Sequence, residues 1–191
     1  MEEMAVEHFL DGILDLSTHE LTDELFGGIH AGNAERLLSA SLIGIPRLLI
    51  PGAADVITMA EPETIPDPFR NQPWVPHNPH ITLVRTDAGQ LTRLAQVVAA
   101  RLNQAQGPAA VAIPRKGWSF YNRPGLIFYN AEADQAYVDT LKTGLRKDIP
   151  VYEFDCHIND PEFSAYIVQV FEGLMQQAES RLHRTGREIH P

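Results

Sequence analysis

Residues 151–175 read VYEFDCHINDPEFSAYIVQVFEGLM, and this stretch decides the fold class. The apolar run at 151–154 is typical of a buried strand, and the apolar spacing at 163–175 is typical of an amphipathic helix. Four polar residues lie where the strand gives way to the helix, namely Asp155, His157, Asn159 and Asp160. Ligands of open α/β sheets bind outside the carboxyl ends of the strands. The stretch therefore predicts a strand–helix unit with a candidate site at its turn.

The same alternation recurs along the rest of the chain. Apolar runs predict further strands at 9–16, 45–50, 56–59 and 109–113. Helical spacing and capping residues predict helices at 20–26, 34–43, 88–102 and 132–146. Gly44 is expected to end the second of these helices and Asp87 to cap the third. Strands separated by helices of this length indicate right-handed crossovers, so we expect an α/β fold with a mostly parallel sheet and helices on both faces.

Two segments depart from this alternation. Residues 62–79 contain six prolines, which disfavour both helix and central strand, so we expect an irregular excursion or a lid there. Residues 176–191 are polar and basic, and we expect a helix extension and a tail. The remaining residues, 1–175, are predicted to form one α/β domain.

The charge balance and the single cysteine narrow the class of protein. With 15 Lys and Arg against 25 Asp and Glu, the net charge of -10 opposes binding to a phosphate backbone, so nucleic acid is not an expected partner. Cys156 stands alone, which excludes an intramolecular disulfide and fits a reducing cytoplasm. The N-terminus is acidic where a signal peptide needs positive charge, and no apolar run reaches spanning length. We therefore expect a cytoplasmic protein that does not insert into a membrane.

Polar residues follow several of the predicted strands, and parallel topology gathers strand ends at one edge of the sheet. The candidate ligand-binding residues at this edge are Asp15, Ser17, Thr18, Gly52, Asp55, Lys116, Gly117, Ser119 and Asn159. The alternative for any single one is a structural role, since Ser17, Thr18 and Asp160 are also residues that cap helices. We expect that they are not all caps.

His157 is the candidate for acid/base chemistry, because imidazole changes charge near neutral pH. Asp155 or Asp160 could orient its ring, so these three residues form the predicted catalytic group. The alternative is a histidine that bridges a strand end to a loop by hydrogen bonds. Cys156 alternates to the opposite side of the strand and is expected to be buried rather than nucleophilic.

Two further motifs contain residue types that can bind a metal or a phosphate. His77 and His80 could offer two imidazoles to a metal, but the proline between them and the lack of a nearby acidic ligand argue against it, and no metal is expected. Lys116, Gly117 and Ser119 are similar to a phosphate-cradling loop. The Walker spacing and a GxGxxG motif are both absent from the sequence.

Several ordered motifs carry a resemblance to a known family. They are GILDLSTHEL at 12–21, GIP at 44–46, PGA at 51–53, HNP at 77–79, RT at 85–86, KGWS at 116–119 and HINDP at 157–161. In these motifs the chain, up to about Met175, resembles the second half of the two-domain unit of the tomato mosaic virus resistance protein family. Asn122 and Asn130 stand where that family commonly has aspartate.

The resemblance implies a Rossmann-like three-layer sandwich and a homodimer. In the plant member it implies an inhibitory complex with a viral replication helicase that involves ATP. The family's nucleotide assignment belongs mainly to the preceding domain, so the resemblance implies an ATP-binding partner domain or subunit and leaves ATP open as a cofactor of this chain. It also adds Asn78 and Arg85 to the candidate ligand residues. A chain that begins at Met1 in this family is expected to be either a separately encoded half or an excised piece.

Two classes of function remain open. The first is an enzyme, or half of one, that acts on a small anionic or carbonyl-bearing metabolite, with Lys116, Arg85, Ser119 and strand-end amides holding the anion. The second is a binding or assembly domain whose polar edge pairs with a nucleotide-binding domain or a second subunit. A site completed between two domains would reconcile the two, because ligand clefts often lie at domain interfaces.

Overall fold

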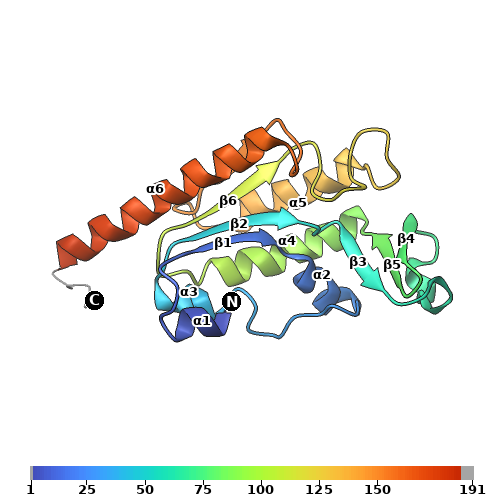
Figure 1. The fold of residues 1–191 in the computed structure, drawn as a ribbon, viewed down its shortest axis with the longest axis horizontal. Helices are drawn as coiled ribbons and strands as arrows, with labels where there is room; N and C mark the ends of the chain where they lie inside the picture. The colour runs from blue at the N-terminus through green and yellow to red at the C-terminus, as the bar shows by residue number, and fades with distance from the viewer. Residues whose placement is uncertain (1, 186–191) are drawn as a thin grey trace.

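The computed structural model describes residues 2–185 and is built on a four-stranded parallel sheet (Figure 1). The strands, in the spatial order β1-β2-β6-β7, are β1 (Ile13–Ser17), β2 (Arg47–Gly52), β6 (Ala109–Pro114) and β7 (Val151–Phe154). Every residue of the two central strands is buried, as their nearly continuous apolar runs predict. The predicted parallel sheet is confirmed.

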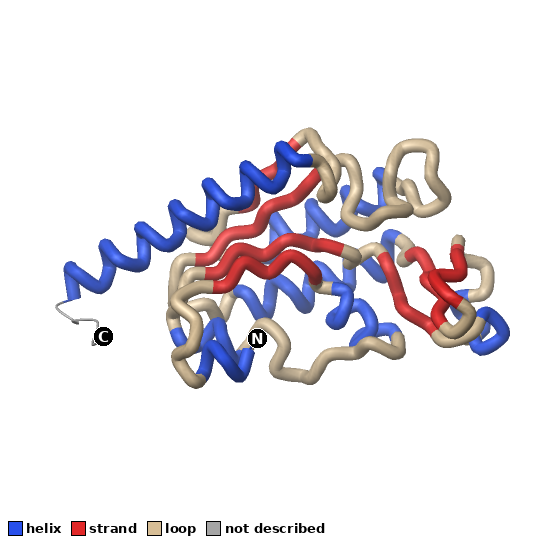
Figure 2. Tube along the Cα trace, in the orientation of Figure 1, coloured by secondary structure: helices blue, strands red, loops and turns tan. Residues whose placement is uncertain are grey.

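Helices cover both faces of this sheet and make three layers (Figure 2). The helices α4 (Ala88–Leu102) and α5 (Ala131–Gly144) pack on one face, and α6 (Pro161–Thr185) crosses the other. The alternation of side chains along β2 explains this arrangement, because Leu49 faces α4 and α5 whereas Leu48 and Ile50 face α6. The Rossmann-like three-layer sandwich is therefore confirmed.

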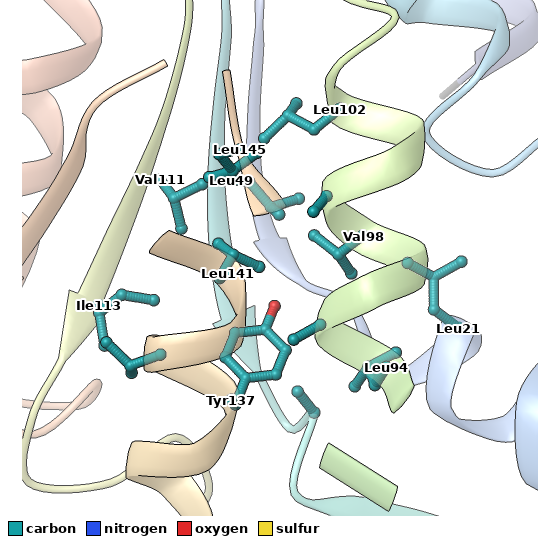
Figure 3. Close-up of a cluster of buried hydrophobic side chains, with 14 of the residues drawn as sticks. Leu21, Leu49, Leu94, Val98, Leu102, Val111, Ile113, Tyr137, Leu141 and Leu145 are labelled. Carbon is teal, nitrogen blue, oxygen red and sulfur yellow. The ribbon is translucent and has the colours of Figure 1, made fainter. Parts of the chain in front are cut away.

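The larger core lies between the sheet and the pair α4 and α5, and Figure 3 shows part of it. Tyr137 of α5 lies in this cluster, with its ring at 5.0 Å from that of Trp118 in an edge-to-face contact. The side chain is fully buried, and within residues 2–185 its hydroxyl has no hydrogen-bond partner. Burial raises the pKa of this phenol above its ordinary value.

We expect Tyr137→Phe to stabilise the protein, because it removes a buried hydroxyl whose desolvation no hydrogen bond offsets. A gain of about 1 kcal/mol in the free energy of unfolding is expected, measured by urea denaturation. Thr140→Val on the same helix is the control. It removes a hydroxyl that does have a partner, because the Thr140 hydroxyl donates to the Ala136 carbonyl at 2.7 Å. A loss of stability in Tyr137→Phe would show that the hydroxyl has a partner, such as a buried water.

A second, antiparallel sheet of three strands lies beyond the carboxyl ends of β1 and β2 (Figure 1). Its strands, in the order β3-β5-β4, are β3 (Val56–Met59), β5 (Ile81–Arg85) and β4 (Trp74–Asn78). The proline-rich segment was predicted to be irregular, and this is wrong for β4, although the 3₁₀ helices η1 (Pro62–Thr64) and η2 (Asp67–Phe69) precede it. Pro76 is tolerated because β4 is an edge strand. Strand β5 was not predicted either.

The N-terminal elements differ from their predicted bounds. A short helix α1 (Glu2–Val6) precedes β1, and the strand begins at Ile13 rather than at residue 9. The predicted helix at 34–43 is reduced to α3 (Ser39–Ile43). The carboxylate of Glu2 accounts for the difference, since it accepts the backbone N–H groups of Leu37 and Ala40 and pairs with Arg47. Leu37 itself has a φ of 70°, which a continuous helix does not allow.

The other predicted helices are present with small shifts. Helix α2 (His19–Phe26) begins after Thr18, whose side chain makes no capping hydrogen bond. Asp87 caps α4 and forms a capping box with Gln90, and Gly44 ends α3 in the left-handed conformation, as predicted. Helix α6 continues past Met175 to Thr185, and the rest of the predicted tail lies outside the described residues. In the described part of the chain, no helix combines the length and apolar character that crossing a bilayer requires.

Candidate functional site

A cleft of about 480 Å³ lies between the carboxyl edge of the parallel sheet and the small antiparallel sheet. Chain segments from five places in the sequence meet there, so the tertiary fold creates it. Its apolar wall comes from the small sheet and from the loop after β6. Its lining residues are His19, His30, Ala53, Val56, Thr58, His77, Asn78, Ile81, Leu83, Ser119, Phe120 and Tyr121.

The end of β1 positions His19 at the mouth of this cleft. Ser17 Oγ donates to the carbonyl oxygen of Gly52 at 3.1 Å and lies 3.0 Å from Nδ1 of His19. Because the one hydroxyl proton goes to Gly52, Ser17 Oγ is an acceptor for a hydrogen bond from Nδ1 of His19. The ring of His30 lies edge-on to that of His19, with 5.8 Å between the centroids. Two imidazoles therefore meet at one side of the cleft.

Close packing of β1 against β2 explains the glycine at the end of β2. A Cβ atom at Gly52 would lie 2.0 Å from the carbonyl oxygen of Leu16, so no other residue fits there. The backbone N–H of Thr18 donates to the Gly52 carbonyl at 3.0 Å, and the buried Thr18 hydroxyl has no partner in the described part of the chain. Ser17, Thr18 and Gly52 thus act together as the support of His19.

Asp55 lies behind Ser119, one of the residues that line the cleft. Ser119 Oγ donates to Oδ2 of Asp55 at 2.7 Å, and Asp55 is fully buried. Burial raises the pKa of the Asp55 carboxyl, although the positive charge of Arg85 and the Ser119 hydrogen bond lower it. The cleft therefore has an ionisable group one hydrogen bond away from its surface.

A buried polar network continues from Asp55 into α5. Arg85 pairs with Asp134, with 2.5 Å between Nη2 and Oδ1. Asn122 Nδ2 donates to Oδ2 of Asp134 at 2.9 Å. Burial raises the pKa of Asp134 to about 6, Arg85 lowers it, and the neighbouring Asp55 raises it. Two carboxyl groups thus share one arginine.

A second polar cluster lies at the carboxyl ends of β6 and β7. Lys116 Nζ donates to the backbone carbonyl of Asp155 at 2.8 Å and to its carboxylate at 3.1 Å. The Asp155 side chain is 88% exposed, so this ion pair is a surface contact. Gly117 has a φ of 120°, and its carbonyl accepts the N–H of Ile158. The lysine is therefore turned to β7 and is not among the residues that line the cleft.

His157 joins the two clusters through both nitrogens of its ring. Nε2 lies 3.0 Å from the carbonyl oxygen of Ser119, so Nε2 carries the proton. Nδ1 accepts from Nη2 of Arg123 at 3.0 Å and from the N–H of Asn159 at 3.1 Å. Burial lowers the pKa of His157 and the charge of Arg123 lowers it further, whereas the Ser119 hydrogen bond raises it. These are the contacts of a bridging, neutral histidine.

The predicted orientation of His157 by a carboxylate differs from the observed one. Asp160 Oδ2 accepts the backbone N–H of His157 at 2.7 Å rather than a ring nitrogen. Asp155 is held by Lys116 instead. Asp160 has the geometry of a loop cap before α6, because a carboxylate readily accepts a nearby backbone N–H. Cys156 is buried with Phe163, as predicted, and burial raises the pKa of its thiol.

The structure separates the remaining candidates into groups. Asn78 and Ser119 line the cleft, and Asp55 lies directly behind it. Asp15 instead makes a buried two-pronged ion pair with Arg36, at 2.6 and 2.7 Å. Arg85 is also buried, and its guanidinium faces the interior.

Several residues of the site were not predicted as site residues. His19, His30, Thr58 and His77 line the cleft, and Asp134 completes the network behind it. These cleft residues come together only because the small sheet folds over the strand ends, and that sheet was not predicted. A signal for Asp134 was present in its position in the first turn of a predicted helix, where a charged residue on the buried face needs a partner.

Two other features bear on where the site lies. Among residues 2–185 no group of three or more His, Cys, Asp or Glu side chains is arranged to hold a metal ion. A larger hollow of about 600 Å³ lies at the opposite edge of the sheet, beneath α6. Its walls include Ile45, Pro46 and Met175, and it lies far from the strand ends that carry the polar clusters. We therefore assign the candidate site to the cleft at the carboxyl edge.

Comparison with known proteins gives relatives of bacterial and plant origin. The chain is 34% identical over 178 residues to a UPF0261 protein of Clostridium tetani, which covers 93% of the chain and 44% of that protein. It is 33% identical over 175 residues to the ToMV susceptible protein tm-1(GCR26) of Solanum lycopersicum, covering 90% of the chain and 23% of the plant protein. The ToMV resistance protein Tm-1(GCR237) of the same plant is 32% identical over 173 residues. The chain thus spans less than half the length of these relatives.

A family model described as the C-terminal domain of an uncharacterised protein family (UPF0261) matches residues 1–175. The match covers the whole parallel sheet, the small sheet and the first part of α6. The resemblance drawn from the ordered motifs is confirmed by this match and by the tomato relatives. The chain belongs to the UPF0261 family and carries its C-terminal domain.

Proposed function

We propose that the cleft at the carboxyl edge binds a small anionic metabolite or a nucleotide, and that a partner domain or subunit completes the site. The observation that supports this most is the convergence of His19, His30 and His77 with Asn78 and Ser119 around one cleft. Ligand sites of proteins are mostly apolar clefts with a few converging polar groups. An imidazole can neutralise an anion when protonated and accept a hydrogen bond when neutral.

The relatives support the second half of this proposal. The chain covers 44% of the Clostridium tetani protein, so a further part of that protein is available to close the cleft. Pairing with an ATP-binding domain, homodimerisation and a cytoplasmic location belong to the same proposal and stay predictions. The acid/base role of His157 also stays a prediction, and it would require the ring to release one of its hydrogen bonds.

A matched pair of histidines tests the proposed cleft. His77 and His80 lie on the same hairpin, but only His77 is among the cleft-lining residues, whereas His80 contacts Glu61 on the surface. Thermal shift would be measured with pyruvate, glucose 6-phosphate, inorganic phosphate and ATP, since a ligand of the native state raises the melting temperature. We expect that a compound which stabilises the wild type loses its effect in His77→Gln and keeps it in His80→Gln. Equal shifts in both variants would place binding elsewhere.

An assembly function is the second candidate, and the loop after β6 favours it. This loop exposes four large apolar side chains, with 67% of Phe120, 42% of Leu126, 55% of Ile127 and 41% of Tyr129 accessible. Exposed apolar side chains gathered in this way often mark a protein contact. Sedimentation of the purified chain tests whether this loop is an interface. If it is, Ile127→Asp should lower the association state. Val168→Asp on α6 is the control and should leave the association state unchanged.

A further inference from the structure

Arg123 lies in the loop between β6 and α5, which projects beyond the carboxyl end of the parallel sheet (Figure 1). Arginines elsewhere in the described chain, such as Arg36, Arg85 and Arg115, form ion pairs with a carboxylate. Arg123 forms no such pair with any described residue. Its side-chain hydrogen bond goes from Nη2 to Nδ1 of His157, at 3.0 Å. The charge of this guanidinium is therefore not balanced by an ion pair within the described structure.

The Nε–H group of Arg123 is a buried donor without an acceptor among the described residues. The side chain as a whole is half-buried, so bulk water does not fully surround its charged group. Burial of a polar group without a partner costs free energy, and such a group in a native protein commonly marks the place of a bound water or ion. Arg123 thus combines an unbalanced charge with an unused donor.

Two acidic residues in the loop after β7 do not neutralise Arg123. Asp160 Oδ2 accepts the backbone N–H of His157 at 2.7 Å, and Asp155 pairs with Lys116. Both carboxylates are therefore engaged with other donors, and in the described structure neither makes an ion pair with Arg123.

His157 holds the guanidinium without cancelling its charge. Its Nε2 lies 3.0 Å from the carbonyl oxygen of Ser119, so the proton is on Nε2 and Nδ1 presents its lone pair to Arg123. The backbone N–H of Asn159 shares this lone pair, at 3.1 Å. A neutral imidazole orients the planar fork of an arginine, whereas a carboxylate would also neutralise it. The arginine is therefore positioned and still carries an available positive charge.

We infer that Arg123 binds an oxyanion, the carboxylate or phosphate group of a small ligand, and that His157 is the residue that positions its guanidinium. The planar donors of a guanidinium match both oxyanions, because they form paired hydrogen bonds with two oxygens. The net charge of -10 repels anions, so an anion site in this chain needs a local positive charge that no carboxylate cancels. Lys116 and Arg85, which were predicted to hold an anion, both have carboxylate partners.

The same loop connects this anion site with the cleft. Ser119, Phe120 and Tyr121 line the cleft, and Arg123 follows two residues later. His157 contacts Ser119 with one ring nitrogen and Arg123 with the other. The anion site stands on the contacts of Arg123 alone. That its anion belongs to the ligand of the cleft rests on the proposed function.

Calorimetric titration of the whole chain with inorganic phosphate tests the anion site, at an ionic strength held constant with sodium chloride. We expect saturable binding to the wild type and a dissociation constant about tenfold or more higher in Arg123→Gln, because charge-assisted hydrogen bonds are lost. Arg70→Gln is the control. It removes an exposed arginine that pairs with Asp67, so the affinity for phosphate should stay unchanged.

A parallel titration with acetate separates the two sources of the oxyanion. Tighter binding of acetate indicates a carboxylate ligand, and tighter binding of phosphate indicates a phosphorylated one. No saturable binding of either anion to the wild type, or equal affinities in the wild type and Arg123→Gln, would rule the site out.

Nuclear magnetic resonance of the imidazole nitrogens locates the bound anion. The Nδ1 signal of His157, identified by its loss in His157→Gln, should shift as phosphate binds to the wild type, because the hydrogen bond from Arg123 changes. Binding that leaves this signal unmoved would contradict the role given to His157.

The variant His77→Gln separates this inference from the proposed function of the cleft. Phosphate binding that depends on Arg123 and survives in His77→Gln keeps the anion site even if the cleft itself binds no ligand. Binding that depends on His77 and not on Arg123 would support the cleft and contradict the anion site.

Discussion

Arg85→Leu is expected to destabilise the protein by about 3–5 kcal/mol, because it leaves the buried Asp134 carboxylate without its counter-charge. Arg85 is 2% exposed and Asp134 is 9% exposed, so water cannot take the place of the guanidinium. The variant also loses the hydrogen bonds from Arg85 to the carbonyls of Phe128 and Thr86. The loss would be measured as the change in the free energy of unfolding in urea. Arg70→Leu is the control and should change it by less than about 1 kcal/mol, because the Arg70 side chain is 62% exposed.

The destabilisation by Arg85→Leu should depend on pH in a defined direction. The pKa of Asp134 is raised from 3.8 to about 6 in the folded protein, so the native state binds more protons than the unfolded state between these values. Stability from this group is therefore complete below pH 3.8 and is lost as the pH rises through about 6. Without Arg85 the carboxyl is harder still to ionise, so the gap between variant and wild type should widen from pH 4 to pH 7. A gap that narrows with rising pH would contradict the assigned ion pair.

Gly117→Ala is expected to have the second large effect and to cost about 3 kcal/mol or more. A Cβ atom at this position would lie 1.5 Å from the carbonyl oxygen of Asn122, which is backbone and cannot rotate away. The φ of 120° adds strain for any residue with a side chain. Because the same loop carries Ser119, we expect loss of the hydrogen bond to Asp55 together with the loss of stability.

Gly125→Ala in the same loop separates the clash from the backbone strain. Gly125 has a φ of 85°, and a Cβ atom there would meet nothing within 4 Å. Its cost should be about 1–2 kcal/mol, which is that of the left-handed conformation alone. Urea denaturation of both variants measures the difference. Equal losses would show that the loop moves freely and that the contact between Gly117 and Asn122 is not a fixed part of the site.

The variants Arg85→Leu and Gly117→Ala act on different parts of the structure that supports the cleft. Arg85 holds the network from the side of β5 and α5, and Gly117 holds the loop that places Ser119 over Asp55. Two of the cleft residues, His30 and His77, are exposed to solvent.

The sequence predicted the layers well because their signals are local. Strand β6 and helix α4 were predicted nearly to the residue, since a continuous apolar run and a capped helix with regular apolar spacing depend only on neighbours in the chain. The stop at Gly44 was also local, because a left-handed residue after a helix favours glycine. The helix at 34–43 was misplaced because Glu2, far away in sequence, takes the backbone N–H groups of Leu37 and Ala40.

The candidate site was predicted less well for a physical reason. The sequence placed polar residues at the strand ends, and Asn78, Ser119 and Asp55 do meet at the cleft. It could not predict that the ring of His157 is occupied at both nitrogens, since Ser119 and Arg123 approach it from another loop.

The sequence by itself determined the α/β class, the parallel sheet, the family and the edge at which polar groups gather, because periodicity, capping and ordered motifs are properties of the chain. The tertiary structure alone decided which of these groups face a cleft and which are used up in buried ion pairs. Asp15 lies within β1 and Arg85 ends β5, and both face buried partners, whereas Ser119 lies in the loop after β6 and faces the cleft. That difference is set by contacts between residues far apart in sequence, which no local pattern records.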